Sequence, residues 1–369
     1  MTKWKSLLSM VLAVLFCFSG ALADPTVIQP DMDFQLSEAV LGGIQAANPE
    51  EEGLCPLTGL PMVDEPYTPI ALVLDDSPEV FPHWGVADAD WIVQTPLRRD
   101  GDTRLVAVYG SRYPEQAGGV RSARMTTFSV ATLFTAAAAS GSWPPNWSEN
   151  VSVEHWIDEL DYNKPIRYFN LLGTKYRERV DFLEEPWNLS GHVREMHESL
   201  AKRTVKGITA KPIKFEPRFF RFADAPLTGG DEAASVGVRF LNMDDPALES
   251  GTSACSFAYT EGKGYTRDSS TGLYSDRDTG EPLVFANVII LRTPLEWEED
   301  SNYPYYRDQL KGCGQAEFFQ SGRHVTGAWY RKTKKSRLVL LDEAGEEIQL
   351  QRGKTFMILG DEHTVVSYE

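Results

Sequence analysis

The pattern of apolar and polar positions predicts strands and helices in the first two thirds of the chain. Three short apolar runs rich in β-branched residues predict buried strands, at residues 69–76, 90–97 and 103–110. Helices are expected over residues 120–139 and 189–204, the second with Ser190 as its N-cap. This mixture of strands and helices favours an α/β domain, which we place at residues 54–225.

The last third has a different pattern, in which short strand-like runs alternate with turns. Asp276, Gly280, Gly322 and Gly345 mark several of these turns. The pattern predicts an antiparallel β-rich domain of about seven or eight strands at residues 236–369. Residues 221–235 are expected to form a linker. The expected fold class is therefore mixed α+β, with an N-terminal α/β domain followed by a C-terminal antiparallel β-rich domain.

The first 23 residues predict a cleavable signal peptide. Lys3 and Lys5 precede an apolar run, and Ala21-Leu22-Ala23 is a small-residue cleavage site, so we expect the cut after Ala23. A lipid anchor on Cys17 is less favoured, because the bulky Phe16 precedes it where a lipoprotein signal has a small residue. Export to an extracytoplasmic location follows from this prediction.

Beyond the leader, the chain is acidic. Residues 24–53 are acidic without periodicity and predict a flexible arm. No later run has the length of about 18 apolar residues that a membrane-spanning helix needs, so no transmembrane span is expected in the mature chain. The formal net charge is −17, and removing the two leader lysines makes it −19. Such a charge argues against nucleic acid as a partner, and any anionic ligand needs a locally basic pocket.

The sequence lacks the common signatures of cofactor and metal sites. It has no P-loop, no G-x-S-x-G motif and no zincin motif, and His192 and His197 lie five residues apart, off a common helical face. We therefore expect no metal and no cofactor. After cleavage three cysteines remain, and export permits a disulfide between Cys255 and Cys313. The alternative is three free thiols.

The sequence GGVRSAR, residues 118–124, contains the most informative charges. Arg121 and Arg124 fall in the first turn of the expected helix, where the helix dipole disfavours cations. Gly118 and Gly119 would allow a tight turn before it, and Arg104 lies on a nearby strand. The arginines therefore predict contact with oxygen anions, which suit the planar guanidinium. Two sources of anions are open: a bound ligand, or acids of the chain itself, namely Asp75, Asp76, Asp88 or Asp90.

Asp75 and Asp76 end the first predicted strand. In open α/β sheets, ligands bind beyond the carboxyl ends of the strands, so these carboxylates are site candidates. Because side chains alternate along a strand, the two should point in opposite directions. A turn-forming or capping role before Ser77-Pro78 is the simpler alternative.

Several ordered motifs resemble the YerB-like family of exported bacterial proteins, many of them lipoproteins. They include CPLTGLP, PIALVLDDSPEVFPHWGVADADWIVQTPL, TRLVAVYG, GGVRSAR and GQAEFFQSGRHVTGAWYRK, and the resemblance runs from about Cys55 to Tyr368. It implies an N-terminal α/β part and a β-rich C-terminal part. It implies no established activity, although some members are linked to the cell-wall synthesis machinery.

This chain departs from the family pattern where the family carries histidines. It has AAAASGSWPPN after the arginine segment, and Trp187 where a histidine is usual. The polar residues that remain at the family's positions are Arg104, Arg121, Ser122, Arg124 and Asn188.

These residues, with Asp75 and Asp76, form the expected ligand-binding site. We expect an exported cell-envelope protein that binds a partner protein or an anionic or glycan ligand, such as cell-wall synthesis proteins or cell-wall glycan. The alternative is a hydrolase or transferase acting on the cell wall, with Asp75, Asp76 or Asp102 supplying acid–base chemistry.

Overall fold

The computed structural model describes most of the chain after the leader. The described residues are 24–49, 51–143, 153–162, 167–202, 204–205, 208–209, 215–217, 219–245, 253–298, 305–308 and 310–369. The expected signal peptide and its cleavage site lie outside them, as does the end of the AAAASGSWPPN stretch.

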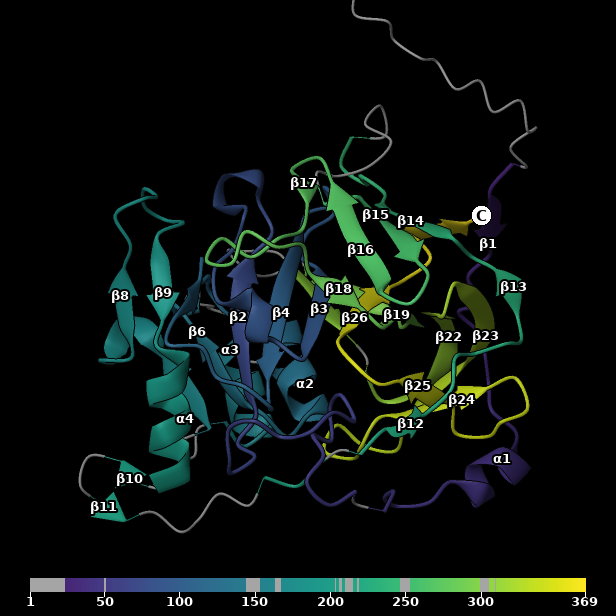
Figure 1. Ribbon diagram of the computed structural model, residues 1–369, viewed down its shortest axis with the longest axis horizontal. Coiled ribbons are helices and arrows are strands. Elements are labelled where there is room, and N and C mark those ends of the chain that lie inside the picture. Colours follow the sequence, from purple (N-terminus) through teal and green to yellow (C-terminus); the bar gives the residue numbers. More distant parts are fainter. Residues whose placement is uncertain are drawn as a thin grey trace, which may run out of the picture.

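One long sheet crosses the molecule and contains strands from both halves of the sequence (Figure 1). In the described part of the chain it has eleven strands, in the order β13-β23-β22-β19-β26-β3-β4-β2-β6-β7, with β24 paired to β23. Their bounds are β13 Asp231–Glu232, β23 Arg323–Arg331, β22 Gly312–Gln320, β19 Asn287–Arg292, β26 Thr355–Gly360, β3 Trp91–Pro96, β4 Thr103–Tyr109, β2 Ile70–Asp75, β6 Ala137–Ser140, β7 Tyr168–Asn170 and β24 Val339–Asp342. The two halves join where β26 pairs in parallel with β3, with Thr355 opposite Trp91.

A second sheet lies against the C-terminal half, in the order β1-β27-β14-β15-β16-β17, with β18 paired to β16. Its bounds are β1 Thr26–Ile28, β27 Thr364–Tyr368, β14 Ser235–Phe240, β15 Cys255–Thr260, β16 Gly264–Ser269, β17 Gly272–Leu273 and β18 Val284–Phe285. Smaller pairings join β5 Ala117–Gly118, β9 Leu189–Gly191 and β8 Arg177–Arg179; β12 Arg221–Ala223 and β25 Gln349–Gln351; β20 Leu295–Glu298 and β21 Tyr305–Asp308; and β10 Thr204–Val205 and β11 Ile208–Thr209.

Four α-helices occur in the described residues: α1 Glu38–Gly43, α2 Met125–Leu133, α3 Val153–Glu159 and α4 Val193–Lys202. Short 3-10 helices occupy Pro78–Val80, Val86–Asp88 and Leu171–Gly173. One face of the long sheet packs with the second sheet and α4, through Leu72, Val236 and Met196. The other face packs with α2 and α3, through Val93 and Phe128 among others. Apolar layers on both faces explain why the central strands are buried along their whole length.

The three strands expected from the apolar runs are confirmed as β2, β3 and β4. The helix expected over 120–139 is wrong at both ends, because only Met125–Leu133 is helical. Thr135 has a positive φ of 53°, and Ala137 to Ala139 then form a strand beside β2. Burial between neighbouring strands overrides the high helix propensity of this alanine run. The molecule is mostly β, so the expected α/β character of the N-terminal half is weak.

The second expected helix is confirmed as α4, which begins at Val193. Its apolar residues Val193, Met196 and Leu200 are buried at helical spacing. Ser190 is not its N-cap; it lies in β9, and its hydroxyl accepts a hydrogen bond of 3.0 Å from the Trp84 indole N–H.

The C-terminal half contains more strands than expected, and they are not all antiparallel. Fifteen strands run from β13 to β27 in its described residues, and β26 is parallel to both β19 and β3. The expected linker 221–235 supplies β12 and β13. The sequence misses these short strands because their apolar residues are few.

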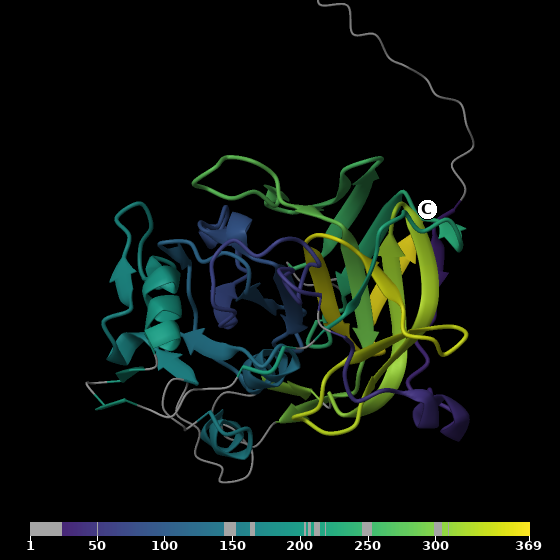
Figure 2. The same ribbon diagram turned by 60° about the horizontal axis from the view of Figure 1, so that its bottom comes forward.

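The flexible arm expected at 24–53 is instead packed against the C-terminal half (Figure 2), where α1 in purple lies beside the yellow strands. Its strand β1 pairs with β27. The amide of Asn48 donates to the carbonyl of Phe219 and to Glu347, at 3.0 and 2.6 Å. Phe34, Leu36 and other apolar residues of this segment cover Val339 and Leu341, which explains its order.

Candidate functional site

The candidate site lies where three parallel strands end. β2, β6 and β7 are parallel neighbours, and their last residues are Asp75, Ser140 and Asn170. Polar side chains at the carboxyl ends of parallel strands are a common setting for ligand sites. We call this region the carboxyl edge.

The GGVRSAR segment crosses the carboxyl edge as extended chain. The N–H of Asp75 donates to the carbonyl of Gly119 at 3.0 Å, and the N–H of Arg121 donates to the carbonyl of Val73 at 3.0 Å. The N–H of Gly141 then donates to the carbonyl of Arg121 at 2.9 Å. Arg121 is thus outside the helix, which corrects its expected place in the first turn.

The two glycines are required by close packing. A Cβ on Gly118 would lie 2.2 Å from Cζ2 of Trp84, and a Cβ on Gly119 would lie 2.3 Å from the carbonyl oxygen of Trp187. Any larger residue would push the segment away from its neighbours. The glycines therefore fix the position of Arg121 rather than forming an anion-binding turn.

Asp75 joins the two arginines of the site. Its Oδ1 contacts Nη1 of Arg104, and its Oδ2 lies 2.7 Å from Nε of Arg121. The Asp75 and Arg104 side chains are 6% and 7% exposed, whereas the Arg121 side chain is 30% exposed. Both guanidinium groups thus contact one carboxylate, and Arg121 is the more exposed of the two.

This arrangement decides part of the question that the sequence left open. The chain itself supplies an anion for Arg104 and Arg121, and that anion is Asp75. Asp90 has another role: its carboxylate accepts hydrogen bonds from the N–H groups of Gly110 and Ser111, at 2.6 and 2.8 Å.

Asp76 belongs to a separate buried cluster. Its carboxylate accepts hydrogen bonds from Gln94, at 2.9 Å, and from the Thr103 hydroxyl, and it lies 3.5 Å from Nη2 of Arg267. Burial raises the pKa of Asp76, while the charge of Arg267 opposes that rise. Asp75 and Asp76 therefore face different partners, as the strand alternation predicts.

A buried histidine forms a hydrogen bond with the backbone of Asp75. Nε2 of His83 lies 2.7 Å from the carbonyl oxygen of Asp75, and because a carbonyl only accepts, this nitrogen carries the proton. Burial lowers the pKa of His83 to about 4, so the ring is neutral at pH 7. The backbone that carries the site carboxylate is thereby held by a neutral donor.

The other predicted site residues lie around Arg121 but play different parts. Arg124 is the N-cap residue of α2, and its Nη1 donates to the carbonyls of Ser122 and Ala123, at 3.2 and 2.9 Å. Ser122 itself is partly exposed beside Arg121. Asn188 is held through its Oδ1 by Nη1 of Arg179 at 2.6 Å.

Two further residues of the candidate site could not be predicted from the sequence. Arg179 comes from the β8–β9 hairpin, and Asn170 reaches the carboxyl edge through the parallel pairing of β6 and β7. The Oδ1 of Asn170 is buried without a hydrogen-bond partner in the described part of the chain. Neither residue stands in a recognisable sequence motif.

The contacts of Asp75, Asp76 and Asp102 give little support to a role for these residues in acid–base catalysis. Asp75 is held by two arginines and Asp76 by three donors, as described above, and Asp102 is ion-paired with Arg98. Within the described ranges, no group of three or more histidine, cysteine, aspartate or glutamate residues could hold a metal ion. The carboxyl edge is therefore better suited to binding an oxyanion than to moving a proton.

Of the two alternatives for the cysteines, a Cys255–Cys313 disulfide or free thiols, the structure has the free thiols. Cys255 and Cys313 are free thiols, as is Cys55. The Cys255 Sγ lies 3.8 Å from Oε1 of Gln94, whereas the Cys313 Sγ lies 3.8 Å from the carbonyl of Phe34. The two cysteines belong to different sheets, β15 in one and β22 in the other, which explains why they do not meet.

Two family models match the chain. Residues 57–206 match the model described as "Protein of unknown function (DUF3048) N-terminal domain", and residues 247–357 match its C-terminal counterpart. The chain belongs to the DUF3048 family. This result confirms the family resemblance and supports the division into an N-terminal and a C-terminal domain.

The chain is also similar to a curated relative from Bacillus subtilis (strain 168), named "Putative lipoprotein YerB". It is 25% identical over 309 residues, covering 82% of this chain and 84% of the relative. A solved structure titled "Crystal structure of YerB protein from Bacillus subtilis" matches with a TM-score of 0.66 at 22% identity, covering 85% of this chain and 99% of that one. The structural match shows a shared fold. No helix in the described residues is long and apolar enough to cross a membrane.

Proposed function

We propose that this DUF3048 protein is exported to the cell envelope and binds an anionic ligand at Arg121. The leader sequence and the lipoprotein name of the Bacillus subtilis relative support export. The observation that carries the binding proposal is that Asp75 meets the partly exposed Arg121 through Nε alone.

The geometry of Arg121 supports an oxyanion as the ligand. Asp75 contacts its Nε, and within the described residues Arg121 makes no other ion pair. The Nη groups therefore remain to donate to a second carboxylate or phosphate, and the partial exposure of the side chain gives access. A fixed positive charge in a chain of net charge −17 also gives selectivity, because the surrounding surface repels anions elsewhere.

A carboxylate carried on a cell-wall glycan fits this site as a ligand. Two partly exposed tryptophans flank the arginine segment: Trp143 follows Ser142, whose carbonyl accepts from Ala123 at 2.7 Å, and Trp187 abuts Gly119. Aromatic faces stack on sugar rings, and a guanidinium binds the sugar's carboxylate. A partner protein that presents a carboxylate would use the same contact with Arg121.

Calorimetric titration tests the proposal directly. The probe is a peptidoglycan disaccharide–peptide fragment, which carries free carboxylates, and the comparison ligand is uncharged chitobiose. We expect Arg121→Gln to weaken binding of the fragment about ten- to a hundredfold, the value of one lost charge-assisted contact. Chitobiose should bind the wild type much more weakly than the fragment does.

The matched control is Arg323→Gln. Arg323 is 35% exposed and pairs with Glu232 at 3.6 Å near the other end of the long sheet, so it resembles Arg121 in exposure and in having an acidic partner. Its substitution should leave binding unchanged. Equal affinity of Arg121→Gln and wild type, or no binding of the fragment by the wild type, would overturn the proposal for this ligand class.

A further inference from the structure

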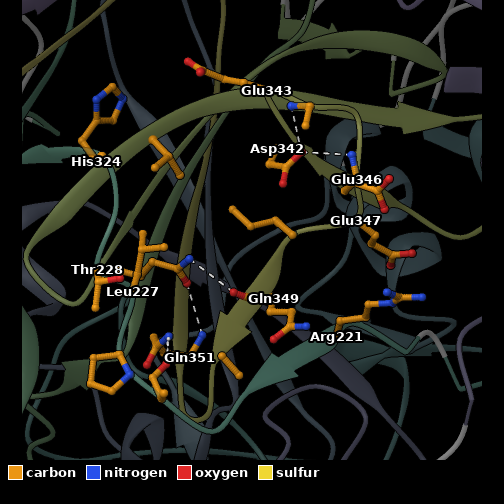
Figure 3. A pocket seen from close by; sticks show the side chains of 18 of the residues that line it. Arg221, Leu227, Thr228, His324, Asp342, Glu343, Glu346, Glu347, Gln349 and Gln351 are labelled. Carbon is orange, nitrogen blue, oxygen red and sulfur yellow. Dashed lines mark hydrogen bonds between the residues drawn. The ribbon is translucent and has the colours of Figure 1, made fainter.

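A hollow lies in the C-terminal half, far along the long sheet from Arg121. It has a volume of about 1010 Å³ and is lined by residues 223–231, by the outer edge of β23 and by the turn between β24 and β25 (Figure 3). Hollows of about 340 and 770 Å³ adjoin it, the first sharing Arg221, Glu346 and Glu347 and the second sharing Pro226 and Gln351. Together they form a groove that is longer than a single small-molecule pocket.

The groove contains a break in strand pairing. On the outer edge of β23, β13 pairs with Arg323 and His324, and β24 pairs from Gly327 onward. Between these two partners, Val325 and Thr326 lie opposite no strand on that edge in the described part of the chain. An unpaired stretch of strand edge offers backbone groups to an added extended peptide.

The lining combines an apolar floor with acidic walls. Leu227, Val325 and Ile348 supply apolar surface. The ionisable residues of the 1010 Å³ hollow are one arginine, His324 and six carboxylates: Arg221, with Asp224, Asp231, Asp342, Glu343, Glu346 and Glu347. The adjoining 770 Å³ hollow adds two carboxylates and three cations: Glu232, Glu261, Lys263, Arg323 and Arg352. Figure 3 shows Asp342, Glu346 and Glu347 along one wall, above Arg221. The excess of carboxylates in the 1010 Å³ hollow favours a cationic occupant there.

Not all of this charge is available to a ligand. Glu347 is paired with Arg337 at 2.7 Å, and Asp224 with Arg352 at 2.9 Å. Glu343 and Glu346 are exposed in the β24–β25 turn, and neither is in an ion pair within the described residues. These two carboxylates are therefore the ones that a bound cation would meet first.

We propose that this groove binds an extended basic peptide segment of a partner protein. Lysine or arginine stems would lie on the apolar floor while their charged ends reach the carboxylates, and the peptide backbone would meet the open edge of β23. The site is independent of the carboxyl edge and takes a ligand of opposite charge.

Fluorescence polarisation with a labelled peptide of alternating lysine and valine tests the proposal. The variant Glu343→Gln with Glu346→Gln should bind it about five- to thirtyfold more weakly, as expected for two exposed charge contacts. The control Glu65→Gln with Glu281→Gln removes the same charge from exposed positions outside the groove lining and should bind like wild type. A glutamate–valine peptide should not bind.

Three results would overturn the proposal. Equal weakening in the two double variants would mean general attraction to an acidic chain rather than a groove. Displacement by spermine as efficient as by unlabelled peptide would mean that the peptide backbone plays no part. Self-association of the wild type in sedimentation, lost in Glu343→Gln with Glu346→Gln, would make a second copy the occupant.

Discussion

At the scale of single residues, Asp75 is the group on which the site depends. Replacing it by asparagine would remove the carboxylate that contacts the buried Arg104. We expect Asp75→Asn to lower the free energy of unfolding by about 3–5 kcal/mol, because breaking a buried ion pair by removing one partner is costly. Urea denaturation followed by circular dichroism measures this loss.

Asp224→Asn is the matched control at this scale. Asp224 also pairs with an arginine, Arg352, at 2.9 Å, but its side chain is 87% exposed. Its replacement should change the free energy of unfolding by less than about 1 kcal/mol. Similar losses in the two variants would show that Asp75 does not hold a buried charge.

At the scale of elements, the extended segment 119–124 places Arg121, and Gly119 fixes that segment. A Cβ at Gly119 would meet the Trp187 carbonyl oxygen at 2.3 Å and Cγ2 of Val80 at 2.6 Å. We expect Gly119→Ala to lower the free energy of unfolding by about 1–3 kcal/mol through overpacking. It should also weaken binding of the peptidoglycan fragment, because Arg121 moves with the segment.

Gly42→Ala is the control for Gly119→Ala, because it adds the same methyl group at a position where no atom is close. Gly42 lies in α1, and a Cβ there has no atom within 4 Å. Alanine should stabilise the protein by up to about 1 kcal/mol, since glycine is the poorer helix former. If Gly119→Ala proves as harmless as Gly42→Ala in chemical denaturation, close packing does not position Arg121.

The strands and helices also show which parts of the fold can be predicted from the sequence. Apolar runs predicted β2, β3 and β4, and helical spacing predicted α4, because each buries its side chains in the pattern that its own backbone dictates. The alanines of β6 and the short strand β1 carry no such pattern, since pairing with β2 and β27 determines them. Likewise, GGVRSAR indicated that the arginines meet an anion, but only the fold brings Arg104 and Arg121 to the same carboxylate.

At the scale of the whole molecule, the two family domains share one sheet. β26 and β3 pair over four buried positions, and Nζ of Lys354 also donates to the carbonyl of Ala89 at 2.6 Å. Separating the domains would expose both strands. We therefore expect calorimetric unfolding in a single transition, with a van't Hoff enthalpy close to the calorimetric one. Two resolved transitions would show that the domains are independent.

The central claim is that Arg121 retains donors for an anion in an otherwise acidic molecule. Nuclear magnetic resonance of protein labelled at arginine nitrogens tests it most directly, with the Arg121 side-chain signal assigned by its loss in Arg121→Lys. Titration with the carboxylated peptidoglycan fragment should shift that signal saturably and leave the Arg323 signal unchanged. An Arg121 signal that stays constant while the fragment binds elsewhere would contradict the claim.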